Sequence, residues 1–333
     1  MHDKLLPLLA CPECWGALSL VAVRRSGDTT EEGSLTCAAC GMSYPIRGSI
    51  PRFVPAENYG DSFGLQWDRF RTVQLDSYSG VPLSEERFRS ETGWSESDLQ
   101  GAWLMEGGSG AGRFLEIAAK MGADVVGVDI SAAVDAAHKT LGHLSNVHFV
   151  QASLFKTPFK DGAFHRIYCL GVLQHTPTPL EAFSEFYRVL MPGGSCAVTV
   201  YERRRFTALY SKYLLRHLTK RVPPHLLLAA IERLMPVLFG ATDVLFRLPL
   251  AGRLFRFAVP VANYTDEPRL SREQRFSWAV LDTFDALAPE FDSPQREPAV
   301  RAAMSRFGFV SVERRPARGL VVRAQKPTLP VVR

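Results

Sequence analysis

The sequence lacks any long uninterrupted hydrophobic run, because no stretch of about 18 apolar residues occurs without a charge. That absence argues against a membrane-spanning helix. A secretory signal peptide is not expected either, since the first ten residues already contain Asp3 and Lys4 and lead directly into a cysteine pair. Both observations favour a protein of the cytoplasm.

Cysteine is also scarce, with six in 333 residues, so no disulfide framework is indicated. Cys169 and Cys196 stand singly in apolar, strand-like runs, where a buried and inert thiol is expected. The other four cysteines form two close pairs near the start of the chain. A reducing compartment fits this usage.

The two Cys-x-x-Cys pairs are separated by 22 residues. Each pair fits a tight turn, and a hairpin that joins two such turns completes the four-sulfur tetrahedron that Zn²⁺ prefers. The hairpin is expected to have a strand at 17–23, a polar turn at 25–33 and a short return strand. Redox pairs are the alternative, but neither pair opens a helix in a βαβ unit. We therefore predict a closed, structural zinc site on Cys11, Cys14, Cys37 and Cys40.

The segment after the second pair reads Tyr44-Pro-Ile-Arg-Gly-Ser-Ile-Pro-Arg-Phe-Val54. Together with the cysteine pairs it resembles the small Trm112-like zinc domains, which carry Cys-Pro-x-Cys, Cys-x-x-Cys-Gly and a Tyr-Pro-Ile tail. The resemblance covers roughly the first 55 residues. In that family the domain is a partner or activator of methyltransferases, so the resemblance implies a zinc ribbon at 1–57 that is fused in cis.

A glycine-rich turn follows the apolar run that ends at Glu106. Its glycines are Gly108, Gly110 and Gly112, and residues 114–121 beyond them have a helical composition. Glycine takes positive φ without penalty and lets the backbone approach a ligand closely. Such strand-to-helix turns lie at the carboxyl edge of a parallel sheet, where ligands bind.

A second strand-like run, 124–130, contains Asp129, which lies 17 residues after Gly112. This acid is placed to accept hydrogen bonds from both hydroxyls of a ribose. The turn has GxGxG spacing and not the GxGxxG of dinucleotide folds, and Arg113 stands where a third glycine would be needed. The pattern therefore favours an adenosyl ligand without a diphosphate.

With these elements the sequence resembles the class I S-adenosylmethionine-dependent methyltransferases, over about 103–200 and again at 307–313. The resemblance implies that Glu106 faces the methionine ammonium group, that the glycine turn contacts the cofactor and that Asp129 holds the ribose. It also implies a cofactor contact at Ser153, where the family often has an aspartate that contacts the adenine amine. A serine accepts a hydrogen bond more weakly than a carboxylate. Leu154 and Leu170 complete the implied cofactor pocket.

After the fourth strand-like run, the loop reads Leu173-Gln-His175-Thr-Pro. The equivalent loop of the family lies beside the transferring methyl group and commonly reads Leu-x-His-x-Pro. His175 is either a general base or a residue that holds the loop in shape. Both interpretations stay open, because methyl displacement depends on in-line positioning and does not always need a base. The Asn/Asp-Pro-Pro-aromatic motif for amide or exocyclic nitrogen is absent here, which disfavours nucleic-acid amines as acceptors.

Aromatic residues at 63, 67 and 70 suit one face of a helix ahead of the core. They either pack on the sheet or belong to a lid, at 58–100, over the cofactor pocket. A second segment, 278–292, is acidic and aromatic and is expected near the mouth of the active site. For its aspartates, helix capping and pairing with basic residues are the alternative. The candidates for substrate contact are Gln66, Trp67, Arg87, Asp282 and Asp285.

Residues 203–259 contain eleven Lys or Arg against two acidic residues, a local net charge of +9 in a chain whose net charge is +5. The segment also carries apolar residues at helical intervals. We rank a helical cap on the core first. Contact with an anionic membrane, or with a lipid-linked substrate, is second. RNA binding is third, because little aromatic–basic alternation occurs.

Five strand-like runs that alternate with helices make a parallel α/β sheet the natural class. The predicted fold is a Rossmann-like methyltransferase sheet with helices on both faces, a small N-terminal zinc ribbon and a helical insertion. The expected boundaries are 1–57, 58–100, 101–201, 202–286 and 287–333, the last with a C-terminal hairpin.

The expected function is transfer of a methyl group from S-adenosylmethionine to a small-molecule, natural-product, lipid-linked or glycan-linked acceptor. The rival interpretations are a non-catalytic protein that binds an adenosyl ligand or recruits partners, an RNA methyltransferase and a nucleotide-dependent oxidoreductase. The expected location is the cytoplasm, with the inner face of the membrane as the alternative that the basic insertion leaves open.

Overall fold

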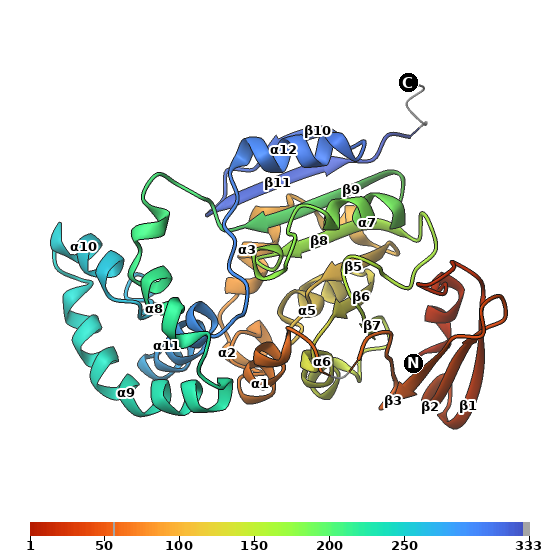
Figure 1. The fold of residues 1–333 in the computed structure, drawn as a ribbon, viewed down its shortest axis with the longest axis horizontal. Helices are drawn as coiled ribbons and strands as arrows, with labels where there is room; N and C mark the ends of the chain where they lie inside the picture. The colour runs from red at the N-terminus through yellow and green to blue at the C-terminus, as the bar shows by residue number, and fades with distance from the viewer. Residues whose placement is uncertain (56, 329–333) are drawn as a thin grey trace.

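The computed structural model describes residues 1–55 and 57–328. A four-stranded sheet lies at the N-terminal end and a seven-stranded sheet lies in the middle of the molecule (Figure 1). Helices surround the larger sheet, and a group of helices forms the end of the molecule that lies far from the small sheet.

The seven-stranded sheet is doubly wound. Its strands are β5 (Trp103–Gly107), β6 (Asp124–Asp129), β7 (Val147–Gln151), β8 (Phe164–Leu170), β9 (Leu190–Val200), β10 (Val310–Arg314) and β11 (Leu320–Gln325). Strands β5 to β9 are parallel and lie in the order β7-β6-β5-β8-β9, while β11 runs antiparallel to β9 and carries β10 at the edge. The chain therefore reverses its direction of winding between β5 and β8, and ligands bind at such a switch point. This confirms the predicted fold class.

Helices cover both faces of this sheet. One face packs against α3 (Leu83–Thr92), α5 (Arg113–Lys120) and α6 (Ala133–Leu141), and the other against α7 (Ala182–Val189) and α12 (Glu297–Arg306). In β6, Val125 belongs to the first layer while Val126 and Val128 belong to the second, as the period of two requires. Each parallel strand is buried on both sides, which explains its continuous apolar sequence.

The N-terminal domain consists of η1 (Asp3–Leu8), β1 (Leu18–Ser26), β2 (Thr29–Cys37), β3 (Ser43–Arg47) and β4 (Ile50–Pro51). Its first hairpin turns at Gly27 and Asp28, with Gly27 at a φ of +54°. The expected turn at 25–33 is therefore too long. Polar residues at 29–33 continue the strand, because one face of an antiparallel sheet can meet solvent.

The N-terminal domain docks on the edge and on one face of the large sheet. Arg52 forms a parallel bridge with Gln151 of the edge strand β7, and the backbone N–H of Phe53 donates to the carbonyl of Gln151 at 2.8 Å. The backbone N–H of Ala10 donates to the carbonyl of Pro158 at 3.0 Å in the connection between β7 and β8. That connection contains no helix, so the domain covers the face that a crossover helix would cover.

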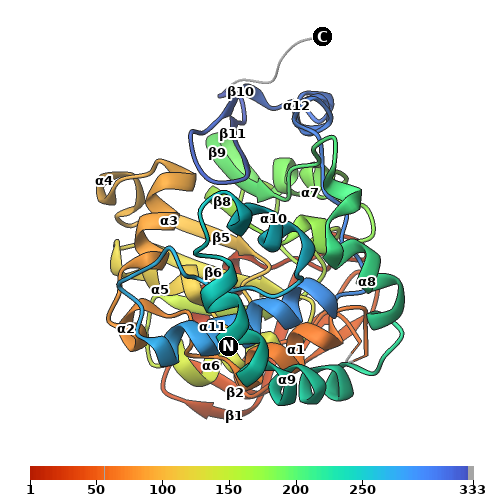
Figure 2. The ribbon, with the colours of Figure 1, turned by 90° about the vertical axis from the view of Figure 1, so that its left-hand side faces the viewer.

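Two groups of helices lie above the carboxyl ends of the parallel strands. The first is α1 (Asp61–Arg69) and α2 (Asp76–Ser79), from which α3 runs along the face of the sheet to α4 (Glu96–Leu99) near the start of β8. The second is η3 (Thr207–Leu209), α8 (Ser211–Thr219), α9 (Pro224–Leu245), α10 (Ala251–Ala258) and α11 (Arg272–Leu287). Helices α8, α9 and α10 face the viewer in Figure 2, and we call residues 203–259 the cap. Within the described residues, no helix combines the length and the apolarity that a membrane crossing needs.

Candidate active site

A cavity of about 1230 Å³ lies at the carboxyl ends of the parallel strands, between α1, α3 and α11. It exceeds the roughly 300–1,000 Å³ of an ordinary small-molecule site, so it has room for two ligands. Most of the residues singled out from the sequence for cofactor or substrate line it. They are Gln66, Trp67, Arg87, Glu106, Gly108, Gly110, Asp129, Leu154, Leu170, His175, Asp282 and Asp285.

The glycine turn approaches its neighbours too closely for any side chain. A Cβ on Gly108 would lie 2.3 Å from a methyl carbon of Val172, and one on Gly110 would lie 2.9 Å from the Trp67 indole. Both glycines have positive φ, at +74° and +51°. Trp67 thus brings α1 directly onto the turn, so α1 borders this end of the cavity, and its role as a lid stays a prediction.

Glu106 is the next-to-last residue of β5 and is almost fully buried, with 2% of its surface exposed. The Tyr168 hydroxyl donates to its carboxylate at 3.3 Å. Burial, reinforced by the nearby Asp129 carboxylate, raises the pKa of Glu106 well above its ordinary value. A cation beside this carboxylate would favour its charged form, so the position suits an ammonium group.

Asp129 ends β6 and is held by three donors. The backbone N–H of Gly110 donates to one oxygen at 3.0 Å, while the N–H and the hydroxyl of Ser131 donate to the other at 2.9 and 2.7 Å. Burial raises the pKa of Asp129, although these hydrogen bonds oppose the shift. The carboxylate is therefore fixed in orientation with lone pairs left over for hydroxyl donors of a ligand.

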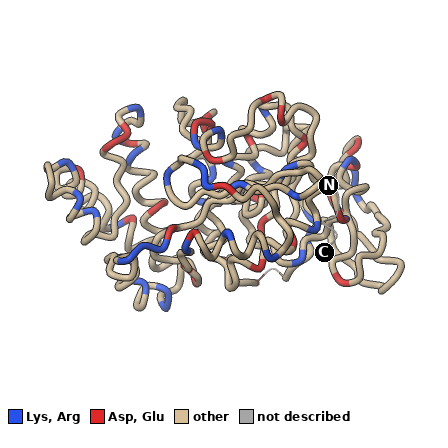
Figure 3. Tube along the Cα trace, turned by 90° about the horizontal axis from the view of Figure 1, so that it is seen from above, with Lys and Arg blue, Asp and Glu red and all other residues tan. Residues whose placement is uncertain are grey.

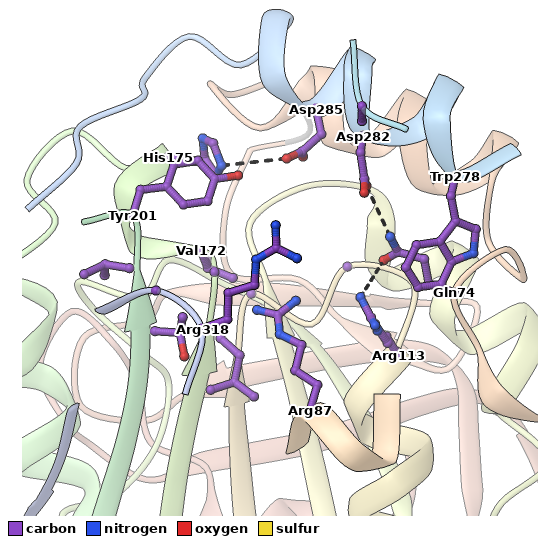
Figure 4. Close-up of a pocket in the computed structure, with 18 of the residues that line it drawn as sticks. Gln74, Arg87, Arg113, Val172, His175, Tyr201, Trp278, Asp282, Asp285 and Arg318 are labelled. Atoms are coloured by element: carbon purple, nitrogen blue, oxygen red, sulfur yellow. Dashed lines mark hydrogen bonds and ion pairs between the residues drawn. The ribbon is translucent and has the colours of Figure 1, made fainter. Parts of the chain in front are cut away.

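His175 lies in η2 (Leu173–His175), next to the end of β8, and its tautomer is set by the backbone. Its Nδ1 lies 3.1 Å from the carbonyl oxygen of Phe291, which can only accept, so Nδ1 carries the proton of the neutral ring. The other nitrogen, Nε2, has no hydrogen-bond partner among the described residues. It lies 4.0 Å from an oxygen of Asp285, as Figure 4 shows. The basic nitrogen of His175 therefore lies beside a carboxylate, and both residues belong to the lining of the cavity.

Helix α11 supplies both aspartates, three positions apart and so on one face. Asp285 accepts a hydrogen bond from Gln66 of α1 at 3.2 Å. Asp282 accepts one from Gln74 at 3.2 Å and another from the Tyr264 hydroxyl. Burial raises the pKa of Asp282 to about 6. These contacts join α1 and the segment that follows it to α11 across the cavity.

Three arginines point into the cavity from the opposite side, as Figure 4 shows for Arg87, Arg113 and Arg318. The guanidinium groups of Arg87 and Arg113 lie 5.3 and 5.1 Å from the centre of the same Phe114 ring. Arg87 pairs with Glu91 at 2.7 Å, whereas Arg113 and Arg318 have no ion pair in the described part of the chain. Burial, together with the Arg87 charge, lowers the pKa of Arg113 to about 10. This side of the cavity is built to receive anions.

Two of the predicted cofactor residues lie outside the cavity lining. Gly112 begins α5 at a φ of +89° and faces Leu141 of α6, so it serves the packing of the turn. Ser153 uses its hydroxyl to accept the backbone N–H of Phe155 at 3.2 Å. Its contact with adenine stays a prediction.

Several residues that the fold brings to the cavity carry no local signal in the sequence. Arg318 belongs to the turn between β10 and β11, and Tyr264 precedes α11 in a loop. Tyr201 follows β9 and packs its ring edge-on against His175, with 5.5 Å between ring centres. Only the position of Tyr201 at the carboxyl end of a predicted strand could have indicated it.

The four paired cysteines come together in the N-terminal domain, outside the lining of this cavity. The sulfur atoms of Cys11, Cys14, Cys37 and Cys40 all lie within 4.8 Å of one another. Cys11 and Cys40 are 3.6 Å apart, and Cys14 and Cys37 are 3.5 Å apart. Four sulfurs around one Zn²⁺ at about 2.3 Å would be separated by about 3.8 Å, so the cluster fits that ion. None of the described residues of this domain lines the cavity.

Comparison with known proteins assigns the two parts of the chain. Residues 105–198 match the family model described as a methyltransferase domain, and residues 2–49 match the one described as Trm112p-like protein. The chain joins a Trm112p-like domain to a methyltransferase domain. The glycine turn, Asp129 and His175 lie within the methyltransferase domain, and the four cysteines lie within the Trm112p-like domain.

The curated relatives match this chain over only part of their own length. The ubiquinone biosynthesis O-methyltransferase of Psychrobacter arcticus is 28% identical over 137 residues, which are 38% of this chain and 52% of that protein. The chain thus spans about half the length of the curated relatives it matches.

Two solved structures align with most of this chain. Phosphoethanolamine N-methyltransferase 2 of Haemonchus contortus, in complex with phosphomonomethylethanolamine and S-adenosylhomocysteine, aligns with a TM-score of 0.45 and 14% identity. The alignment covers 81% of this chain and 48% of that one. A complex that contains the Trm112 methyltransferase activator of Haloferax volcanii aligns with a TM-score of 0.45 and 12% identity, over 80% of this chain and 98% of that one.

Proposed function

We propose that the chain is an S-adenosylmethionine-dependent methyltransferase that acts on a small-molecule acceptor. The observation that carries this proposal is the convergence of Glu106, the glycine turn and Asp129 on one cavity within the matched methyltransferase domain. Glu106 suits the methionine ammonium group, and Asp129 suits the ribose hydroxyls. A relative named as an O-methyltransferase is consistent with an oxygen acceptor.

The chain's own residues would bind and orient both reactants. S-adenosylmethionine, when bound, supplies an electrophilic methyl group. The turn at Gly108 and Gly110 leaves room for the ligand's closest approach to the backbone, and Trp67 of the lid excludes water from that end. His175 accepts the proton at the acceptor's nucleophilic atom, because its Nε2 carries the free lone pair. Asp285, 4.0 Å from that nitrogen, stabilises the imidazolium that results.

The direct test is calorimetric titration with S-adenosylhomocysteine, the demethylated product, which needs no knowledge of the acceptor. Asp129→Asn removes a charged acceptor, so binding should weaken about 10- to 150-fold. The matched control is Asp124→Asn at the other end of β6, outside the cavity, which should bind like the natural protein. If the zinc-loaded natural protein does not bind S-adenosylhomocysteine, the methyltransferase assignment fails and a recognition role for the fold replaces it.

A screen of small phenols and lipid-linked sugars, with S-adenosylhomocysteine release as the readout, would identify an acceptor. With that acceptor, His175→Gln should lower kcat by about 10²- to 10⁴-fold and leave S-adenosylhomocysteine affinity unchanged. His165→Gln, at the other end of β8, is the control and should keep full turnover. Undiminished turnover in His175→Gln would assign the residue to the shape of the loop.

We also propose that Zn²⁺ is the resident ion of the cysteine cluster and that it is structural. Four thiolate ligands leave no open coordination position, which is the arrangement of structural zinc sites. The cluster lies in the domain that covers the edge of the large sheet, so the ion would support the fold and take no part in chemistry.

A lipid-linked acceptor is the form of the proposal that one specific observation favours. The exposed side chains of the cap are predominantly large and apolar or positively charged. An enzyme of the cytoplasm that meets its acceptor at the inner face of a membrane would carry such a surface. RNA is a weaker candidate, since phosphate contacts would leave the apolar side chains uncovered.

A further inference from the structure

The outer surface of the cap is unusually apolar for a surface that meets water. Twenty large hydrophobic side chains are exposed among the described residues, and fourteen of them lie between Phe206 and Leu254. Leu250 is 93% exposed and Leu254 is 66% exposed. Single exposed apolar residues are ordinary, but a concentration of them in one part of a protein marks an interaction surface.

Helix α9 shows that none of the described residues packs against this surface. Its residues Leu227, Ile231 and Met235 are buried in the hydrophobic cluster shared with α11. On the opposite side of the same helix, Val237 is 75% exposed and Val244 is 65% exposed, seven positions apart and so in one stripe. A surface helix normally turns polar residues outward, and a helix that is apolar on all sides is normally buried. The outer side of α9 therefore lacks its partner in the described chain.

Positive charge accompanies the apolar side chains. Figure 3 shows Lys and Arg predominating over Asp and Glu at the end of the molecule that carries the cap. Eight of the cap's basic residues are exposed. Within the part of the chain that the structure describes, six of them have no carboxylate at ion-pair distance: Arg203, Arg205, Lys220, Arg221, Arg233 and Arg253. A surface of this kind suits a partner that is both apolar and anionic.

The same surface borders the opening of the cavity. Tyr210 lines the cavity and is also 43% exposed, so it stands at the rim. Arg204 and Thr207 line the cavity beside it, and the neighbouring Leu209 is 57% exposed. A molecule held against the outside of the cap would therefore lie next to the entrance of the candidate active site.

We propose that the outer surface of the cap is a docking surface for an anionic phospholipid membrane. Its leucine and valine side chains enter the boundary between head groups and acyl chains, and its unpaired arginines and lysine meet the phosphates. A second copy of this chain is disfavoured as the occupant, because it would oppose a local charge of +9 to an equal charge. The inference deepens the proposed function and rests on it in one respect, that an acceptor in the membrane would enter the cavity at the rim.

The test is co-flotation of the full-length, zinc-loaded protein with vesicles. One set is phosphatidylcholine alone, and the other is equal parts of phosphatidylcholine and phosphatidylglycerol. Binding to the anionic vesicles should be at least about tenfold tighter and should weaken as salt is raised. The double variant Leu250→Ser with Leu254→Ser, and separately Arg253→Glu, should each reduce that binding at least about fivefold.

The matched control is Val21→Ser with Val23→Ser on β1, whose side chains are 57% and 82% exposed but lie in the Trm112p-like domain. This variant should float like the natural protein. S-adenosylhomocysteine titration of every variant shows that the cofactor end of the fold is intact.

The outcomes separate the two proposals. A protein that binds S-adenosylhomocysteine but floats with neither vesicle overturns the docking surface and leaves the proposed function standing. Flotation that depends on the cap without S-adenosylhomocysteine binding supports the docking surface and overturns the function. Equal losses in the β1 control, dimers that dissociate on cap substitution without flotation, or tighter binding to a single-stranded RNA than to vesicles would each overturn the docking surface.

Discussion

The cavity sets buried acids against arginines whose charges are incompletely paired. The two aspartates of α11, Asp282 and Asp285, line one side of the cavity. Three arginines point into it from the other side: Arg87, Arg113 and Arg318. Such groups raise the free energy of the protein without ligand, because burial disfavours charge and like charges repel. They would recover that energy by binding ligand groups of complementary charge. Individual residues in this site are therefore expected to trade stability for binding.

We expect Arg87 to contact the carboxylate of the methionine part of S-adenosylmethionine. One of its terminal nitrogens lies 3.4 Å from where a Cβ would stand on Gly171, at the end of β8 beside the strand of Glu106. Arg87→Ala should weaken S-adenosylhomocysteine binding about tenfold or more, because a charged hydrogen bond is lost. Binding of 5′-methylthioadenosine, which has no carboxylate, should be unaffected. Calorimetry with both ligands makes the comparison.

The control for this prediction lies on the same helix. Arg89 points outward and pairs with Glu85 and Glu96, so Arg89→Ala should bind both ligands normally. Equal losses for the two ligands in Arg87→Ala would mean that Arg87 supports the fold of the pocket and does not contact the carboxylate.

Asp282 should lower the stability of the protein at neutral pH. Burial raises its pKa from 3.8 to about 6, so the folded protein holds a proton there that the unfolded chain releases between those values. The contribution of Asp282 is therefore neutral below pH 4 and destabilises by up to about 3 kcal/mol above pH 6. Asp282→Asn should be more stable than the natural protein at pH 7.5, with a difference that shrinks toward pH 4. Chemical denaturation across this range measures it.

Asp68→Asn gives a control of opposite sign. Lys139 lowers the pKa of Asp68, so this carboxylate stabilises the folded protein at neutral pH and loses that effect as pH falls. The Asp68 variant should be slightly less stable than the natural protein at pH 7.5. A pH-independent difference for Asp282→Asn would contradict the expected titration.

Among the structural elements, the Trm112p-like domain contributes to the core of its neighbour. Its residues Leu5, Leu9 and Ile46 belong to the same buried cluster as the strands of the large sheet. Arg52 pairs with Asp135 of α6 at 2.6 Å and also donates to the Gln151 side chain at 2.8 Å. An exposed sheet edge invites aggregation, and this domain covers the β7 edge. Loss of the domain should therefore weaken the methyltransferase domain as well.

Removal of the metal tests that coupling. Each chain should carry one zinc, and Cys14→Ala should lose it, because three sulfurs no longer complete the tetrahedron. The same variant should unfold at a lower temperature and should aggregate more, since zinc binding is part of the folding free energy of such domains. Mass spectrometry under native conditions and thermal unfolding provide the two measurements.

Cys196→Ala is the matched control, because this cysteine is fully buried in β9 and lies outside the cluster. It should keep one zinc per chain whatever it does to stability. If the Cys14→Ala protein retains zinc, or unfolds at the same temperature as the natural protein, the proposed contribution of the ion to the stability of the methyltransferase domain is wrong.

At the scale of the whole molecule, the Trm112p-like domain and the cap lie at different sides of one sheet. The Trm112p-like domain covers an edge and a face, away from the cavity, while the cap and α11 close the carboxyl ends of the strands (Figure 1). The cap thus lies between the cavity and the outside, and its composition decides what can approach. Its apolar and basic surface is the one proposed to dock on a membrane, and the cysteine cluster lies in the domain whose described residues do not line the cavity.

The sequence alone determined the features that depend on short-range patterns. The cysteine spacing predicted a cluster that the fold assembles, because each Cys-x-x-Cys pair holds its two sulfurs on one turn. The glycine turn and the strand-end acids line one cavity, because parallel strands end at one edge and residues at their carboxyl ends meet there. The predicted extent of the first hairpin's turn was wrong, because polar residues at 29–33 are compatible with either a turn or an exposed strand.

Only the tertiary structure decided which distant segments complete the site. Arg318 and Tyr264 come from a hairpin turn and a loop that no local pattern connects, and they meet because the hydrophobic layers bring those elements together. The free nitrogen of His175 is likewise decided by a carbonyl 116 positions away, at Phe291. The uncovered side of α9 follows the same principle, because a sequence shows that a helix is apolar but only packing shows which of its sides finds a partner.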